Sequence, residues 1–309
     1  MQATHAILIA GPTASGKSAV AAAVARAVNG VVINADSMQV YRELPILTAQ
    51  PGADERGEVP HALYGFLPSR EPYSVGRWLD DVAAELRGAE AGGQVPVFAG
   101  GTGLYFKALL EGLSPVPEIP GDIRRRWRAA AQAARPGELH SELARRDPEM
   151  ASRLRPSDPQ RIVRALEVIE ATGRSLAEWQ ALPGTPLIPE DRAVRIVISP
   201  PREVLHDRIN RRFDAMMAGG ALEEVEALAA QRLDPELPAM RALGVPPLMA
   251  GVQGKISMEA AADRVRAETR QYAKRQATWA KRNMISWKWF TEKDSERLKA
   301  DILSFIDLC

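Results

Sequence analysis

A glycine loop between two apolar runs is the feature that most restricts how this chain can fold. Residues 6–10 (AILIA) form a short apolar run that stops at Gly11, and residues 18–27 are rich in alanine. Short length and the following glycine favour a β-strand for the first run, and alanine favours a helix for the second. Between them lies GPTASGKS, which fits the phosphate-binding pattern of Gly, four residues, then Gly-Lys-Ser. The sequence therefore predicts a strand, a phosphate-binding loop and a helix in succession.

Backbone and side-chain groups of this loop suit a phosphate chain. Successive N–H groups form a concave anion site, and the following helix adds the positive end of its dipole. Lys17 supplies a full charge, and the Ser18 hydroxyl can ligate Mg²⁺. The alternative is a chance match in a glycine-containing turn. The predicted phosphate-binding residues are Gly11, Pro12, Thr13, Ala14, Ser15, Gly16, Lys17 and Ser18.

Three further apolar runs, at 30–36, 95–101 and 194–199, alternate with helix-like segments such as 75–90. This alternation predicts an α/β fold with a parallel sheet, in which ligands collect at the carboxyl ends of the strands. Asp36 and the glycine-rich segment 100–103 both follow such runs. We therefore expect them to lie beside the phosphate-binding loop, although they are far from it in sequence.

Asp36 and Thr102 each allow two interpretations. The Asp36 carboxylate could hold Mg²⁺ through water or accept a proton from a nucleophile, or it could cap a helix. Glycines beside Thr102 would let the backbone approach a ligand, but a tight strand-to-helix turn capped by Thr102 explains the segment nearly as well. The residues alone leave both alternatives open.

The region 115–191 differs from the rest, because it begins with a proline-rich link and continues as basic, alanine-rich sequence without a convincing strand. We expect a helical insertion domain there, between the two parts of a core domain at 1–114 and 192–309. The clearest long helix is 259–282, in which Val265, Tyr272 and Trp279 recur every seven residues and are expected to pack onto the core.

Two basic clusters, RRRWR beginning at Arg124 and QRIVR at 160–164, lie in this insertion. Basic residues with an interleaved aromatic residue suit a nucleic-acid backbone, yet most such runs are solvated helix faces. The net charge of +1 means that any basic surface must arise from local clustering.

Composition excludes several other classes. The single cysteine, Cys309, excludes an internal disulfide framework, and the four histidines lack metal-ligand spacing. No apolar stretch approaches the length of a membrane span, and the opening residues do not resemble a secretory signal. We expect a cytoplasmic enzyme with no membrane partner.

Five blocks resemble a known family: GPTASGKS, DSMQVY, GGTGLYFKALLEGLSP, DPEMASRLRPSDPQRIVRALEV and TRQYAKRQATWAKRN. In this order and spacing they are similar to the bacterial tRNA dimethylallyltransferases, also called tRNA isopentenyltransferases, from about Ala6 to about Trp289. The resemblance implies a P-loop NTPase-like parallel sheet core with a helical insertion domain. It also implies transfer of a dimethylallyl group from dimethylallyl diphosphate, with Mg²⁺, to N6 of the adenosine just 3′ of the anticodon in tRNA.

The resemblance also implies roles for individual residues. Asp36 matches the catalytic aspartate, Thr102 a threonine that contacts the same site, and Arg212 an arginine that binds pyrophosphate, although Arg208 and Arg211 lie close by. Lys17 and Ser18 would then bind the diphosphate of the prenyl donor. The expected tRNA contacts are Asp36, Ser37, Met38, Gln39, Thr102, Arg124, Gln160, Arg161, Ile162, Val163 and Arg164. The insertion would clamp the anticodon stem-loop, with the enzyme acting as a monomer.

Two segments depart from the family pattern. Where relatives usually have Arg-x-x-Gly-Tyr-Arg, this chain has RALGVPP at 241–247, and where they commonly have Gly-Thr-Ala-Lys-Pro it has LTAQP at 47–51. The alternatives to the main interpretation are a transferase that prenylates free adenine nucleotides, a small-molecule kinase that uses ATP, and an RNA-binding module with a vestigial loop.

Overall fold

A computed structural model describes residues 6–307 of the chain. Cys309 and the first five residues lie outside the described residues, so the expectations about them are not addressed by the structure. The chain forms two compact units, one made of Met1–Leu110 with Leu187–Cys309 and the other of Glu111–Pro186. The boundaries expected from the sequence lie a few residues further along the chain in both cases.

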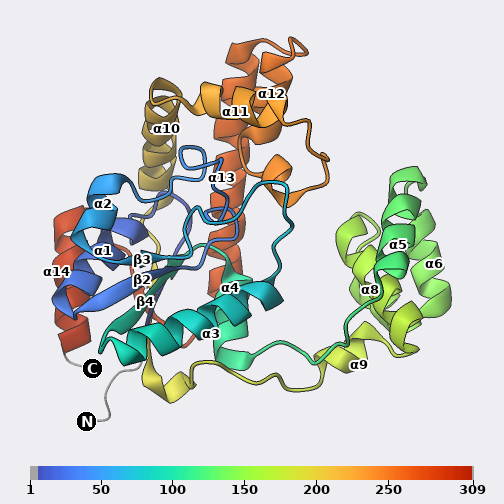
Figure 1. The fold of residues 1–309 in the computed structure, drawn as a ribbon, viewed down its shortest axis with the longest axis horizontal. Coiled ribbons are helices and arrows are strands. Elements are labelled where there is room, and N and C mark those ends of the chain that lie inside the picture. The colour runs from blue at the N-terminus through green and yellow to red at the C-terminus, as the bar shows by residue number, and fades with distance from the viewer. Residues whose placement is uncertain (1–5, 308–309) are drawn as a thin grey trace. The chain divides into compact units, whose positions relative to one another are not determined.

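The first unit is built on a six-stranded parallel sheet with the strand order β3-β2-β4-β1-β5-β6 (Figure 1). Its strands are β1 (Ala6–Ala10), β2 (Gly30–Asn34), β3 (His61–Ala62), β4 (Val95–Gly100), β5 (Ala193–Ile198) and β6 (Lys288–Phe290). The four longer strands coincide with the four apolar runs, so the predicted α/β class is confirmed. The two shortest strands have no apolar run and were not expected.

Helices cover both faces of this sheet and extend to one side of it (Figure 1). They are α1 (Lys17–Ala27), α2 (Ala53–Glu58), α3 (Val75–Ala91), α4 (Gly103–Glu111), α10 (Arg202–Ala218), α11 (Ala221–Ala230), α12 (Val245–Val252), α13 (Met258–Asn283) and α14 (Ser295–Asp307), with short 3₁₀ turns η1 (Glu190–Arg192) and η2 (Pro238–Arg241). Among residues 6–307, no helix has both the length and the apolar character needed to cross a bilayer.

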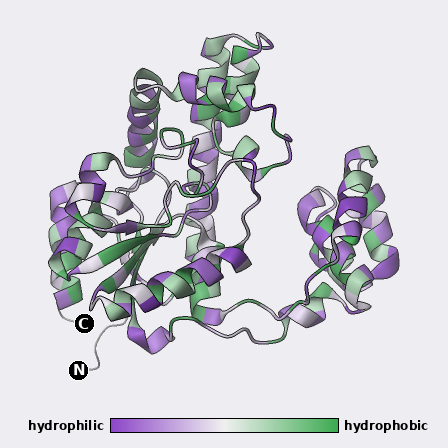
Figure 2. Cartoon of the chain, in the orientation of Figure 1, coloured by the Kyte–Doolittle hydropathy of each residue, from purple (hydrophilic) through white to green (hydrophobic). Residues whose placement is uncertain are grey.

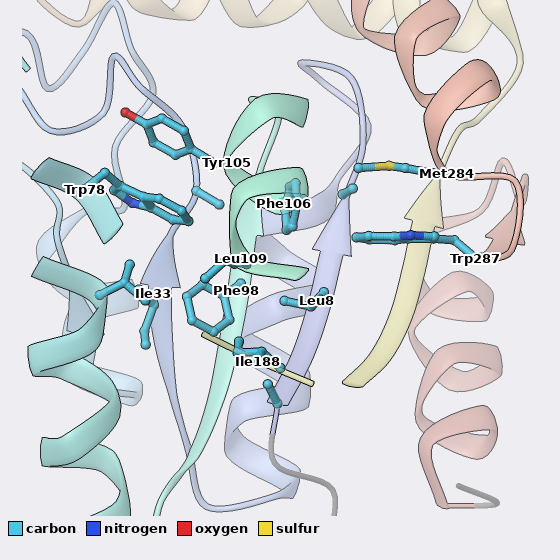
Figure 3. Close-up of a cluster of buried hydrophobic side chains, with 14 of the residues drawn as sticks. Leu8, Ile33, Trp78, Phe98, Tyr105, Phe106, Leu109, Ile188, Met284 and Trp287 are labelled. Atoms are coloured by element: carbon cyan, nitrogen blue, oxygen red, sulfur yellow. The ribbon is translucent and has the colours of Figure 1, made fainter. Parts of the chain in front are cut away.

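Alternate residues of each strand pack on opposite faces of the sheet, as the period of a strand requires. On one face, Leu8, Ile33 and Phe98 pack with Trp78 of α3 and Phe106 of α4 (Figure 3). On the other face, the intervening strand residues pack against α1 and α14. The strands are therefore buried on both sides, and Figure 2 shows them as a hydrophobic centre with hydrophilic stretches on the surrounding helices.

A separate apolar cluster fixes the chain that follows β2. Val40, Leu44 and Leu47 are buried against Phe213 of α10 and Val265 of α13. Helices α10 and α13 thus hold the loop that carries Asp36 in place, through residues far away in sequence.

The second unit consists of α5 (Gly121–Ala133), α6 (Glu138–Arg146), α7 (Pro148–Arg153), α8 (Pro159–Thr172) and α9 (Leu176–Gln180). It has its own apolar core, in which Trp127 of α5 and Leu143 of α6 pack against Leu166 of α8. Asp147 is buried between these helices, where it accepts hydrogen bonds from Met150 N and the Ser175 hydroxyl.

Strand register aligns the starts of three loops. Ala10 of β1 is level with Gly100 of β4, and Ala99 of β4 is level with Asn34 of β2. Because the strands are parallel, the loops that follow them leave from the same edge of the sheet. The sheet therefore brings together the three segments that the sequence predicted to meet.

Candidate active site

The loop between β1 and α1 has the backbone shape of an anion-binding cradle. Ala14 and Gly16 have left-handed backbone angles, with φ of 63° and 94°. Gly16 occupies the N-cap of α1 and provides no side-chain cap, so the first N–H groups of the helix are available to a ligand. Within residues 6–307, the Ser15 hydroxyl is fully buried and has no hydrogen-bond partner.

Lys17 follows this cradle and has an unusual charge balance. Its Nζ lies 3.5 Å from the carbonyl oxygen of Pro12. Burial lowers the pKa of Lys17 to about 8, the nearby Asp36 carboxylate raises this pKa, and the Arg212 guanidinium lowers it. A bound anion would favour the charged ammonium and raise the pKa again.

The three neighbouring arginines of α10 differ in their surroundings. The Arg212 guanidinium donates to the Thr13 hydroxyl, and burial lowers its pKa against the opposing effect of Asp36. Arg208 donates to the carbonyl oxygen of Ser15 at 3.2 Å and to the chain near α14, whereas Arg211 pairs with Asp207 on the exposed side. Arg212 is therefore the α10 arginine whose charge faces both the cradle and Asp36.

Asp36 is held by the residues around it. The buried Asn34 side chain donates to the carbonyl oxygens of Asp36 and Leu63, and accepts from Asp36 N at 2.8 Å. Asp36 Oδ1 accepts from Met38 N at 3.0 Å, which closes a turn rather than capping a helix. Asn34 was missed at the sequence level, although a polar residue ending a buried apolar run is an uncommon feature.

The Thr102 hydroxyl faces the Asp36 loop. It accepts a hydrogen bond from Ser37 N at 3.0 Å, so its side chain joins the ends of β4 and β2. Gln39 has a different environment, because its buried amide donates to the carbonyl oxygens of Thr48 and Ala49. Thr102 and Ser37 therefore lie at the edge of the site, whereas the Gln39 side chain stabilises the loop behind it.

Helix α13 supplies two residues that sequence reasoning did not single out as site residues. Gln276 Oε1 accepts from Thr13 N at 2.8 Å, and its Nε2 donates to the Gly101 carbonyl oxygen at 3.0 Å. Trp279 packs so closely on Gly103 that a Cβ atom there would lie 2.2 Å from the ring. The glycines of the 100–103 segment therefore make room for α13 as well as allowing a turn.

A cavity of about 260 Å³ lies between the phosphate-binding loop, the segment 100–103 and α13. Thr102 lines it on one side, and Phe106, Tyr272 and Trp279 contribute aromatic rings. The side chains of the seven-residue repeat of α13 thus lie in two different environments. Val265 lies in the apolar core as expected, whereas the next two members of the repeat border the cavity.

The residues at the start of α1 fit a loosely held Mg²⁺ ion. The Ser18 side chain is exposed beside Lys17 at the first turn of α1. Within the described part of the chain, no cluster of three or more His, Cys, Asp or Glu side chains could hold a metal by itself. A single hydroxyl suits Mg²⁺, which usually keeps several waters and is bound partly by substrate phosphates.

Comparisons with known proteins agree with this geometry. A model described as IPP transferase matches residues 39–283, and one described as isopentenyl transferase matches residues 4–59. A tRNA dimethylallyltransferase of Parvibaculum lavamentivorans is 52% identical over 98% of this chain and 96% of its own length. The chain belongs to the tRNA dimethylallyltransferase family. A second member, from Nitrobacter hamburgensis, is 53% identical over 95% of this chain and 93% of its own length.

Solved structures of the family share the fold. A tRNA isopentenylpyrophosphate transferase from Bacillus halodurans matches with a TM-score of 0.70 and 32% identity, covering 98% of this chain and 96% of that one. A eukaryotic dimethylallyltransferase, solved acting on tRNA, matches with a TM-score of 0.74 and 28% identity, covering 89% and 69%. The P-loop NTPase-like core implied by the family resemblance is thereby confirmed.

The two departures from the family pattern have structural roles in this member. Val245 is fully buried at the start of α12, and Leu47 is buried in the same apolar cluster. Gln50 donates to the carbonyl oxygen of Tyr41 at 2.7 Å, and Arg56 donates to Gln50 Oε1 at 3.3 Å. These side chains stabilise the loop that follows Asp36.

In the helical unit, the interpretation of Trp127 as an aromatic residue of a nucleic-acid surface is wrong. The side chain is buried, its Nε1 donates to Glu170 at 3.1 Å, and the Arg146 guanidinium lies over its ring. Arg126 also pairs with Glu170. The reason is helical periodicity, which turns Trp127 towards the core while Arg124 remains half-buried at its edge.

The side chains of the segment 160–164 likewise point to different faces of α8. Ile162 and Val163 are buried in the core of the unit. Gln160 is exposed, and Arg161 is 75% exposed with an ion-pair distance of 3.4 Å to Asp158. A polyanion could therefore reach the polar side chains of this segment but not its apolar ones.

Proposed function

We propose that this chain transfers a dimethylallyl group from dimethylallyl diphosphate to N6 of the adenosine that directly follows the anticodon in tRNA. One observation carries the proposal. A phosphate cradle flanked by the Lys17 and Arg212 cations opens beside a carboxylate, Asp36, at a single edge of the sheet. Family membership supports the same reaction.

The cradle suits a diphosphate leaving group. As the allylic carbon–oxygen bond breaks, the electron pair goes to pyrophosphate, and negative charge builds on its oxygens. The backbone N–H groups of Gly16, Lys17 and Ser18 at the start of α1, and the charges of Lys17 and Arg212, are placed to stabilise that charge. The aromatic cavity beside the cradle suits the five-carbon group, because ring faces attract a developing cation.

Asp36 suits the acceptor side of the reaction. The exocyclic amine of adenine is a weak nucleophile, because its lone pair is shared with the ring. As this nitrogen forms its bond to the allylic carbon, it must lose a proton, and Asp36 is the group that would accept it. Thr102, joined to the same loop through Ser37 N, would help to orient the amine.

Mg²⁺ is the cofactor that we propose, held by the Ser18 hydroxyl together with the donor's phosphate oxygens. When bound, it neutralises part of the charge on the leaving group. Lys17 and Arg212 bind and orient the diphosphate from the protein side.

The tRNA contacts are proposed for both units. A base stacked in the anticodon loop must be extruded to reach a reactive group, as in other enzymes that modify bases. We assign the anticodon stem-loop to the helical unit, through Arg124, Gln160, Arg161 and Arg164, and the extruded base to Asp36, Ser37, Met38 and Thr102, with Gln39 stabilising their loop. We propose a monomer as the working form.

Labelled dimethylallyl diphosphate offered with unmodified tRNA, with AMP, or with neither tests the proposal. We expect label in tRNA at N6 of that adenosine, located by nuclease digestion and mass spectrometry. A transcript with guanosine at this position is the matched control and should remain unlabelled. Label in AMP would support a nucleotide prenyltransferase instead, and an absence of transfer would favour a kinase or a binding module.

A further inference from the structure

Gln276 connects the phosphate-binding loop with the loop that follows β4. From the middle of α13, its Oε1 accepts from Thr13 N at 2.8 Å, in the phosphate-binding loop. Its Nε2 donates to the Gly101 carbonyl oxygen at 3.0 Å, in the loop after β4. An amide side chain is suited to this bridge, because it carries one acceptor and a donor at the same end.

The loop after β4 is built around this side chain. A Cβ atom at Gly101 would lie 2.1 Å from Gln276 Nε2, so any larger residue there would displace the amide. Gln276 also lines the cavity described above. Both features indicate a specific contact rather than incidental packing of a helix.

Each end of the bridge leads to a group of the proposed reaction. The Thr13 hydroxyl accepts from the Arg212 guanidinium, so the first end adjoins the diphosphate side. Gly101 directly precedes Thr102, whose hydroxyl accepts from Ser37 N next to Asp36, so the second end adjoins the acceptor side. Gln276 is the side chain that links these two sides directly.

We propose that Gln276 is a positioning residue that fixes the separation between the diphosphate cradle and the Thr102–Asp36 side. This role rests on the proposed function, in which the amine must attack as the diphosphate leaves. Small misplacements of reacting groups slow such steps strongly. A loosened bridge would also give water access to the allylic carbon, with dimethylallyl alcohol and pyrophosphate as the products.

Two substitutions separate this role from simple packing. Gln276→Met removes both hydrogen bonds at similar size. Gln276→Glu keeps the acceptor for Thr13 N but loses the donor to the Gly101 carbonyl. Gln271→Met is the matched control, because Gln271 is exposed on the same helix.

The readouts are kcat with tRNA, the affinity for inorganic pyrophosphate, and the ratio of dimethylallyl alcohol to prenylated tRNA. For both variants of Gln276 we expect kcat to fall about tenfold to a hundredfold and the alcohol ratio to rise. Pyrophosphate affinity should stay within about threefold of the wild type in Gln276→Met, whereas the added carboxylate of Gln276→Glu should weaken it. The product ratio does not depend on how much of the enzyme is folded.

An unchanged kcat and product ratio would overturn the proposal. So would a parallel loss of kcat and pyrophosphate affinity at a constant ratio, since Gln276 would then only shape the cradle. Loss of folding in both variants would assign it a structural role and overturn the proposal as well. If the wild type itself prenylated no tRNA, the proposed function would be wrong, which is a separate result.

Discussion

The Thr102 hydroxyl accepts a hydrogen bond from Ser37 N at 3.0 Å, which ties together two loops separated by 65 residues in sequence. This contact places the end of β4 against the turn that begins at Asp36. The Thr102 hydroxyl thus stabilises the neighbouring loop. Loss of this hydrogen bond should therefore lower the stability of the fold.

Thr102→Val should lower the free energy of unfolding by about 1–3 kcal/mol, because Ser37 N loses its partner in a partly buried setting. Thr102→Ser keeps the hydroxyl and should lose less. Denaturant unfolding of the three proteins measures the difference. Equal stability of the Val and Ser variants would show that the hydrogen bond contributes nothing.

Asp36→Asn should reduce turnover by about 10²–10⁴-fold, because an amide does not accept the proton of the attacking amine. The amide oxygen can still accept from Met38 N, so the turn and tRNA binding should be retained. Single-turnover transfer and a tRNA binding titration measure the two effects. Normal turnover of the variant would refute the assignment of Asp36 as the base.

Lys17 should make anion binding depend on pH near its lowered pKa of about 8. Below this pH the free protein already carries the ammonium, and above it binding must take up a proton, so affinity falls as the pH rises. Between pH 7 and pH 9 we expect the association constant for inorganic pyrophosphate to fall about tenfold through this group.

Lys17→Arg is the control for that measurement, because a guanidinium stays charged over the whole range. Titration calorimetry of both proteins removes the contribution of the ligand's own protonation. If the wild type and the arginine variant had the same pH dependence, Lys17 would not be the titrating group.

Arg161→Ala should weaken tRNA binding and reduce the slope of log affinity against log salt by about one, as the loss of one phosphate contact requires. Arg145→Ala, in the same helical unit, is a matched control because Arg145 pairs with Glu142. Filter binding at several salt concentrations gives both slopes. An unchanged slope for Arg161→Ala would mean that Arg161 contacts no tRNA phosphate and only pairs with Asp158.

Local patterns in the sequence predicted the parts of the fold that depend on neighbouring residues. The strand, loop and helix at 6–27 follow from an apolar run, a glycine motif and alanine, and the structure contains all three. β3 and β6 were missed because two or three residues leave no detectable period. Their pairing with β2 and β5 is fixed by the rest of the fold.

Contacts between distant segments were the main part that the sequence did not reveal. Gln276 lies 263 residues from Thr13, and nothing around either residue indicates that they meet. The block RQATWAKRN marks α13 as a family feature without saying what its glutamine contacts. Trp127 shows the converse error, since a basic neighbourhood suggested a surface role and helical periodicity put the ring in the core.

A crystal structure with an unreactive thio analogue of dimethylallyl diphosphate and Mg²⁺ would show where the prenyl donor binds on this chain. We predict the diphosphate against the N–H groups of Gly16, Lys17 and Ser18, within contact of the Lys17 and Arg212 side chains, and the five-carbon group directed towards Asp36. A diphosphate bound at any other place on the chain would contradict this prediction.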